Sequence, residues 1–212
     1  MAYESRILAI CAGVTRPLFV RESHDDEHLH QTLSGIAKSP ISTLQDPRAV
    51  MCNRLGIDGD EQADLSVHGG PDKAVYCYPA GHYAFWARKI PALAKRPPEE
   101  IFGQVGENLA IDGVDETQIW IEDEMVIGED VILKVCKPRE PCFKFNARMG
   151  DRHASKLMMQ HDICGWYCAV VREGTIKAGD SVLVRPGPRY ITVARANQRL
   201  TRPDENQAAS RS

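Results

Sequence analysis

Short apolar segments bounded by glycine, proline and other turn residues recur along most of the chain, and this pattern constrains the fold more than any other feature. The segments predicted as strands are residues 6–14, 35–44, 73–78, 108–111, 130–136, 166–171, 181–184 and 190–194, and residues 116–126 are predicted as a further strand and turn. Only residues 79–90 and 151–161 have helical spacing, the second with Asp151 placed as an N-cap. Because strands and helices do not alternate, a doubly wound sheet is disfavoured. The sequence predicts a mainly β protein, a closed β-barrel with a few peripheral α-helices.

Two of the strand segments carry finer detail. In residues 130–136, Val131, Leu133 and Val135 alternate with Ile132, Lys134 and Cys136, which predicts one buried face and one partly buried face. In residues 35–44, Pro40 cannot donate a hydrogen bond to a neighbouring strand, so we expect it at a sheet edge or a bulge.

Residues 15–33 are polar and rich in His, Asp and Glu. The side chains of His24, His28 and His30 beside Asp25, Asp26 and Glu27 could hold a metal ion. No cysteine or second group of ligands lies nearby in the sequence, so a solvated, flexible loop is the favoured interpretation.

Length and composition fit one globular domain. We expect a single barrel domain over residues 1–197, with its motifs within about 35–195, and a disordered tail over 198–212. A formal charge of −3 gives no support for a nucleic-acid partner, and neither a membrane-spanning run nor a signal peptide is evident. Seven cysteines without regular spacing fit a reducing compartment, so we expect a cytoplasmic protein.

The segment of residues 137–144, KPREPCFK, presents one cysteine on a loop stiffened by two prolines. Lys137, Arg139 and Lys144 surround Cys142, with Glu140 as the only opposing charge. Nearby cations favour the thiolate, which is both the nucleophile and the metal ligand. A small buried hydrophobic residue at a strand end is the equally weighted alternative from these residues alone.

Two glycine-rich segments, residues 55–71 and 102–109, also carry more polar groups than a core strand needs. The first contains Asp60 and the run His68-Gly69-Gly70, and the second contains Glu107 and Asn108. Together with the basic loop they suit a cofactor that bears a phosphate and a soft metal. His68 could instead be structural, and Glu107 and Asn108 could be turn formers.

Other metal and nucleotide sites have less support. The spacings Cys136-x5-Cys142 and Cys164-x3-Cys168 contain no CxxC pair, so a structural zinc site is a weak alternative. The sequence has no GxSxG, P-loop or GxGxxG motif.

Four linked motifs resemble the MOSC family, the domain also found at the C-terminus of molybdenum cofactor sulfurases, and particularly its YiiM-like branch. They are GIDGDEQADLSVHGGPDKAV (56–75), FGQVGENLAIDG (102–113), KPREPCFKFNAR (137–148) and GWYCAVVREGTIKAGDSVLV (165–184). The resemblance implies a MOSC-type β-barrel that binds the molybdenum cofactor and reduces N-hydroxylated compounds, including N-hydroxylated base analogues.

By the same resemblance Cys142 ligates molybdenum, and Gly69, Gly70 and Asn108 match positions near the cofactor. Arg139 and Lys144 are assigned to the cofactor or the substrate by their charge. The implied reaction is a two-electron reduction that removes the N-hydroxyl oxygen, with Asp60 or His68 as proton donor. It needs a small-molecule substrate and an electron-donor protein, and the cofactor supplies the difficult chemistry.

Two other functions are compatible with these residues. Cys142 could carry a persulfide for sulfur transfer, or the barrel could bind a ligand without chemistry. Pyridoxal phosphate is disfavoured because no lysine is singled out as a Schiff-base former. The YiiM-like branch continues past the barrel into a small helical domain, whereas this sequence ends in a short polar tail.

Overall fold

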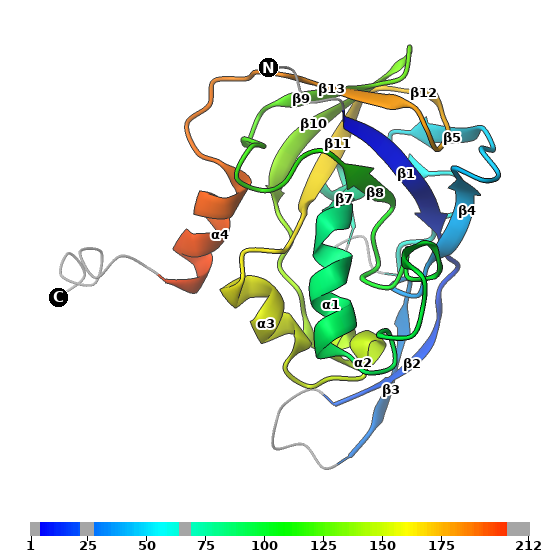
Figure 1. Ribbon diagram of the computed structural model, residues 1–212, viewed down its shortest axis with the longest axis vertical. Coiled ribbons are helices and arrows are strands. Elements are labelled where there is room, and N and C mark those ends of the chain that lie inside the picture. The colour runs from blue at the N-terminus through cyan, green and yellow to red at the C-terminus, as the bar shows by residue number, and fades with distance from the viewer. Residues whose placement is uncertain (1–4, 22–27, 64–68, 203–212) are drawn as a thin grey trace, which may run out of the picture.

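The computed structural model describes residues 5–21, 28–63 and 69–202, and within these ranges strands dominate (Figure 1). The strands are β1 (Ser5–Ala12), β2 (Arg16–Val20), β3 (His30–Ser34), β4 (Ser39–Thr43), β5 (Val50–Asn53), β6 (Gly56–Ile57), β7 (Val75–Pro79), β8 (Leu109–Asp112), β9 (Glu124–Ile127), β10 (Val131–Pro138), β11 (Trp166–Arg172), β12 (Gly174–Ile176) and β13 (Ser181–Arg185). The α-helices are α1 (Tyr83–Lys89), α2 (Phe143–Met149), α3 (Ala154–Gln160) and α4 (Val193–Thr201). Short 3₁₀-helices are η1 (Pro71–Lys73), η2 (Ala80–His82) and η3 (Pro98–Glu100).

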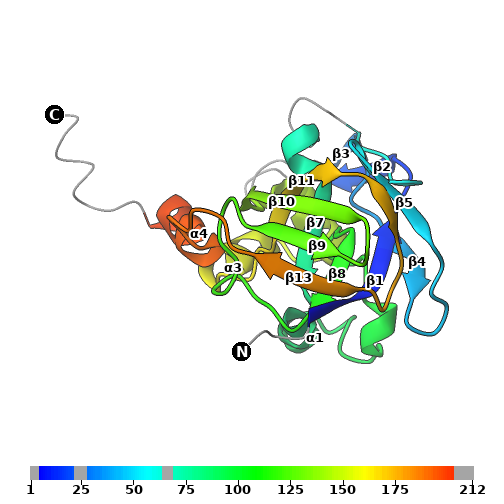
Figure 2. The same cartoon turned by 90° about the horizontal axis from the view of Figure 1, so that it is seen from above.

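Seven of these strands close into a barrel, as Figure 2 shows from above. The order is β13-β9-β10-β11-β7-β8-β1, and β1 pairs back onto β13 through Ser5 with Val182 and Arg6 with Ser181. Neighbouring strands are antiparallel except for β7 and β8, which run parallel. The helices lie outside the barrel wall. The predicted mainly β barrel with peripheral helices is therefore confirmed.

The barrel interior is filled by apolar side chains from every strand of the ring. Strand β7 is buried along its whole length. In β10, Val131, Leu133 and Val135 are buried while the residues between them are partly exposed, as their alternation predicts. Strand β4 lies at the end of the sheet order, and a bulge in β1 falls opposite Pro40, which confirms the expected edge position of this proline.

The prediction of a solvated loop over residues 15–33 is wrong for its two ends, which form a β-hairpin. Strands β2 and β3 pair from Arg16 with Ser34 to Val20 with His30. One face carries Val20 and Ser34, both buried, and the opposite face carries Phe19 and Leu33, both exposed. Strand β2 contacts α2, so tertiary packing gives this polar segment its structure. His24 lies outside the described residues.

Two local predictions near the helices are also corrected, and one helix was not predicted. The segment 190–194, expected as a strand, ends in the first residues of α4, because the Thr192 hydroxyl accepts a hydrogen bond from the Arg195 backbone N–H and caps the helix. Helix α2 had no sequence prediction. The N-cap of α3 is His153 rather than Asp151, whose carboxylate accepts the His153 N–H. The expected domain limits stay a prediction, and α4 extends past residue 197.

Candidate functional site

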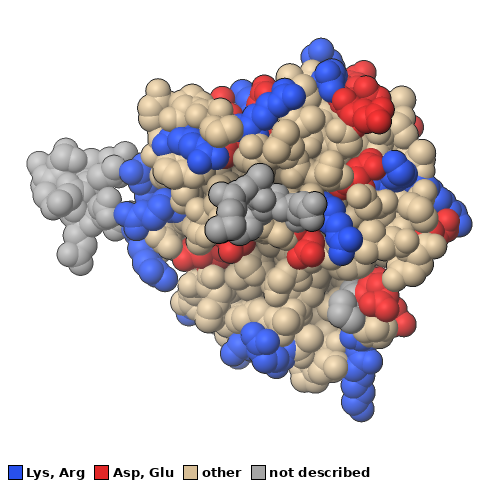
Figure 3. Space-filling model, turned by 45° about the horizontal axis from the view of Figure 1, so that its top comes forward, with Lys and Arg blue, Asp and Glu red and all other residues tan. Residues whose placement is uncertain are grey.

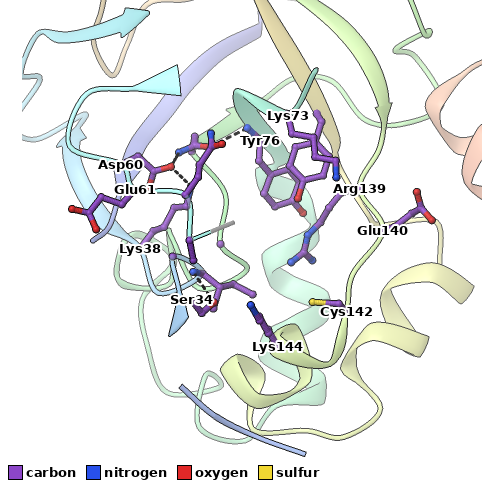
Figure 4. A pocket seen from close by; sticks show the side chains of 17 residues that line it. Ser34, Lys38, Asp60, Glu61, Lys73, Tyr76, Arg139, Glu140, Cys142 and Lys144 are labelled. Atoms are coloured by element: carbon purple, nitrogen blue, oxygen red, sulfur yellow. Dashed lines mark hydrogen bonds and ion pairs between the residues drawn. The ribbon is translucent and has the colours of Figure 1, made fainter. Parts of the chain in front are cut away.

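A pocket beside the barrel brings together residues that are distant in sequence (Figure 4). Its volume is about 710 Å³, including the part that opens to solvent. Its wall is formed by segments from β3, the loop between β3 and β4, the loop after β6, η1, β7, the loop before β8, the loop after β10, α2 and β11. The lining residues are Ser34, Gly35, Ile36, Lys38, Asp60, Glu61, Gln62, Ala63, Lys73, Tyr76, Gly106, Asn108, Arg139, Glu140, Cys142, Lys144 and Tyr167.

Cys142 is half-buried in this wall and is the N-cap residue of α2. Its carbonyl oxygen accepts the Phe145 backbone N–H at 2.9 Å, which anchors the start of the helix. All seven cysteines lie in the described part of the chain, and none forms a disulfide. The Cys142 side chain is thus a thiol at the pocket surface, where a ligand can reach it.

Arg139 is buried, with 5% of its surface exposed, and lines the same pocket. Its guanidinium carbon lies 4.5 Å from the ring centre of Phe145 and 5.1 Å from that of Tyr76. One guanidinium nitrogen donates to the Met158 sulfur at 3.2 Å, and the side chain also hydrogen-bonds to Tyr167. Figure 4 shows the guanidinium pointing into the pocket on the side of Cys142. These contacts fix the position of the positive charge.

Asp60 is held by three donors at the edge of the pocket. Its carboxylate accepts hydrogen bonds from the Lys38 ammonium at 2.6 Å, the Asn108 side-chain amide at 2.8 Å and the Gly13 backbone N–H at 3.0 Å. The side chains of Asp60 and Lys38 are 4% and 9% exposed. Because both carboxylate oxygens already accept hydrogen bonds, the geometry favours a positioning role for Asp60 over the predicted role as proton donor.

Asn108 links this ion pair to the barrel. Its side-chain oxygen accepts the Tyr76 backbone N–H at 3.0 Å, and its own backbone N–H donates to the Tyr76 carbonyl at 2.8 Å. Asn108 is buried, so its amide serves as a structural connection between Asp60 and β7 as well as part of the pocket wall.

The remaining predicted residues differ in their relation to the pocket. Lys144 lines it and donates from its ammonium to the Leu33 carbonyl at 3.1 Å. Gly69 and Gly70 do not line it, although Gly70 has a φ of 98° and is the N-cap of η1, which brings Lys73 to the pocket. His68 lies outside the described residues. The roles of all these residues stay predictions.

Sequence reasoning missed Lys38, Tyr76 and Tyr167. The Tyr76 and Tyr167 rings lie 5.3 Å apart on neighbouring strands and form an aromatic part of the wall. Burial raises the pKa of Tyr76 well above its ordinary value, so its hydroxyl stays protonated and donates to the Cys164 carbonyl. Each tyrosine resembles an ordinary core residue in sequence, and Lys38 is far from any motif.

Glu107 lies in sequence between the pocket-lining residues Gly106 and Asn108 and is completely buried. One carboxylate oxygen accepts hydrogen bonds from the Tyr83 hydroxyl and the Gly103 backbone N–H. The other has no hydrogen-bond partner in the described part of the chain. Burial raises the pKa of this carboxyl above its usual range, although both hydrogen bonds oppose the shift. Burial therefore favours the protonated form of Glu107 more than it would be favoured in an exposed glutamate.

Among the described residues, no group of three or more His, Cys, Asp and Glu side chains is arranged to hold a metal ion. The described residues therefore do not supply a complete set of such ligands for a metal at Cys142. No helix in the described ranges is long and apolar enough to cross a membrane.

Comparison with known proteins identifies the class to which this barrel and pocket belong. Residues 64–183 match the model of the MOSC domain, and the chain belongs to the MOSC domain family. It is 37% identical over 140 residues to protein YiiM of Escherichia coli, covering 66% of this chain and 61% of that protein. It is also 37% identical over 163 residues to a protein named reductase from Gibberella moniliformis, covering 74% of this chain but 28% of that protein.

The similarity to YiiM extends to the fold. The crystal structure of YiiM from Geobacillus stearothermophilus superposes with a TM-score of 0.71, covering 98% of this chain and 89% of that one at 24% identity. The predicted membership of the MOSC family is therefore confirmed, and the chain is similar to YiiM in sequence and in fold.

Proposed function

We propose that this protein is a molybdenum-cofactor-dependent reductase of N-hydroxylated compounds, including N-hydroxylated base analogues. The observation that carries the proposal is the half-buried Cys142 thiol in a pocket that also contains the buried cation Arg139 and the ammonium of Lys144. Membership of the MOSC family and similarity to a protein named reductase support it.

The residues of the pocket fit a pterin dithiolene cofactor with a terminal phosphate. A thiolate is a suitable ligand for a soft metal, and Cys142 is the thiol that lines the pocket. Arg139, Lys144 and Lys73 provide cationic groups for an anionic group. When bound, the molybdenum cofactor would supply the two electrons that the reduction requires.

The protein itself would bind the cofactor, orient the substrate and supply a proton to the leaving oxygen. Cys142 would hold the metal, and Asn108 with the Asp60–Lys38 ion pair would keep the opposite wall in place. The Tyr167 ring offers a surface on which a planar substrate can lie. Asp60 accepts three hydrogen bonds, so a proton for the leaving oxygen would come from another group, and His68 stays a candidate.

The proposal includes partners that a reductase needs. A small N-hydroxylated molecule would enter through the open side of the pocket, and a separate protein would deliver electrons. We propose a cytoplasmic location, since seven cysteines without a disulfide fit a reducing compartment.

The test is the molybdenum and pterin content of protein made in cells that synthesise the cofactor. We expect close to one molybdenum per wild-type chain and a large loss in Cys142→Ser. Cys136→Ser is the matched control, because Cys136 is also partly exposed but does not line the pocket. Wild-type protein that is folded but free of molybdenum would refute the proposal.

The same samples test the sulfur-carrier alternative. Cyanide-labile sulfur on Cys142 of the wild-type protein, absent from Cys142→Ser and accompanied by no molybdenum, would establish a persulfide at this position. Reduction of an N-hydroxylated base by molybdenum-loaded protein would exclude a purely binding function.

A further inference from the structure

Arg139 has an environment that is unusual for a buried charge. Its side chain hydrogen-bonds to the Met158 sulfur and to Tyr167, and among the residues that the structure describes no carboxylate forms an ion pair with it. The adjacent Glu140 is exposed, and its carboxylate points away from the guanidinium in Figure 4.

Another arginine of the chain shows the usual arrangement. Arg189 also lies over an aromatic ring, that of Trp120 at 5.9 Å, but it is 42% exposed at the side chain and pairs with the Asp123 carboxylate at 3.5 Å. A buried cation without a carboxylate is costly unless a ligand supplies negative charge. The guanidinium cannot lose its proton to avoid this cost.

The packing around Arg139 keeps the charge in place. Phe145 of α2 and Tyr76 of β7 lie against the guanidinium, Met158 belongs to α3, and the Arg139 backbone N–H donates to the Gly165 carbonyl at 3.3 Å. Aromatic faces and a sulfur atom favour a cation but do not neutralise it. Arg139 also interacts electrostatically with Cys142, the residue assigned to the metal.

We propose that Arg139 is a positioning residue whose buried charge, which no carboxylate of the described residues pairs with, is neutralised by the group bound at Cys142 and sets the reduction potential of that group. This inference rests on the proposed function for its redox part alone. A fixed positive charge stabilises the more negative, reduced form of a neighbouring centre. Arg139 would therefore make the bound centre easier to reduce.

The first experiment tests, in protein without the cofactor, whether the Arg139 charge binds an anion. Inorganic sulfate and chloride are compared at equal ionic strength in thermal unfolding of cofactor-free wild type, Arg139→Gln, Arg139→Lys and the control Arg189→Gln. We expect sulfate to raise the Tm of wild type, Arg139→Lys and Arg189→Gln, and to raise that of Arg139→Gln less than half as much. An equal gain in Arg139→Gln would overturn the inference even if the protein binds molybdenum.

The second experiment measures the reduction potential of the loaded protein by electron paramagnetic resonance during a redox titration. Arg139→Gln should lower the equilibrium constant for one-electron reduction of the bound centre at least tenfold, which corresponds to a reduction potential lower by about 59 mV. Arg139→Lys should keep most of the wild-type potential. Full molybdenum content with an unchanged potential in Arg139→Gln would reject the redox role while leaving the proposed function intact. Wild type without molybdenum would instead reject the proposed function, and the sulfate comparison would still decide whether Arg139 faces an anion.

Discussion

The Asp60–Lys38 ion pair allows a test in which the chain supplies its own control. Its N···O distance is 2.6 Å, and its side chains are 4% and 9% exposed. The ion pair between Asp46 and Arg48 has the same 2.6 Å distance, but its side chains are 60% and 71% exposed. Asp60→Asn and Asp46→Asn therefore remove the same charge from pairs of equal length and different burial.

The structure predicts very different costs for the two substitutions. Asp60→Asn leaves the Lys38 ammonium buried without its counter-ion and turns one acceptor into an amide donor facing other donors. Breaking a buried pair in this way costs about 3–5 kcal/mol. The exposed Asp46 pair is screened by water, so Asp46→Asn should cost about 0–1 kcal/mol.

The assay is urea unfolding of both variants and wild type, with a check that the dependence on urea concentration is unchanged. The double variant Lys38→Met/Asp60→Asn should recover part of the loss, because it leaves no unpaired charge. A cost below about 1 kcal/mol for Asp60→Asn would refute the view that this pair is a buried, water-excluded part of the wall.

Two further predictions concern the interior. Because the pKa of Glu107 is raised in the folded protein, its contribution to stability is present below the unfolded pKa of 4.5 and is lost as pH rises through the folded pKa. Glu107→Gln should therefore become more stable relative to wild type as pH increases. Parallel profiles of stability against pH for the two proteins would contradict this. Gly165 and Gly150 have φ of 63° and 67°, but a Cβ at Gly165 would lie 2.4 Å from the Cys77 carbonyl oxygen while one at Gly150 meets nothing within 4 Å. Gly165→Ala should therefore lower Tm clearly more than Gly150→Ala, and equal losses would show that backbone strain alone determines the effect.

The parts of the fold that sequence could predict are those with a local pattern. Strand β10 alternates apolar and partly exposed residues, and β7 is a short apolar run, so both are evident without tertiary information. The β2–β3 hairpin is not evident from the sequence, because Phe19 and Leu33 lie on one face only after the two strands pair. The start of α4 had a usable signal in Thr192, a favourable N-cap residue, which the apolar residues around it obscured.

In the candidate site, too, only the features with a local sequence pattern could be predicted. The loop around Cys142 was recognisable because two prolines and three basic residues lie within eight positions. The partner of Asp60 was not, because Lys38 is separated from it by 22 residues and meets it only in the folded barrel. The same holds for Tyr76 and Tyr167, which are brought together by the pairing of β7 with β11.

The contact that closes the barrel has a consequence for how the chain is made. Ser5 and Arg6 pair with Val182 and Ser181, which lie far away in the sequence, so this part of the ring cannot form until β13 has left the ribosome. Until then the first residues of β1 and the free side of β9 expose unpaired backbone, which can pair with other chains. Late, long-range closure of this kind slows folding and extends the period in which a nascent chain depends on chaperones.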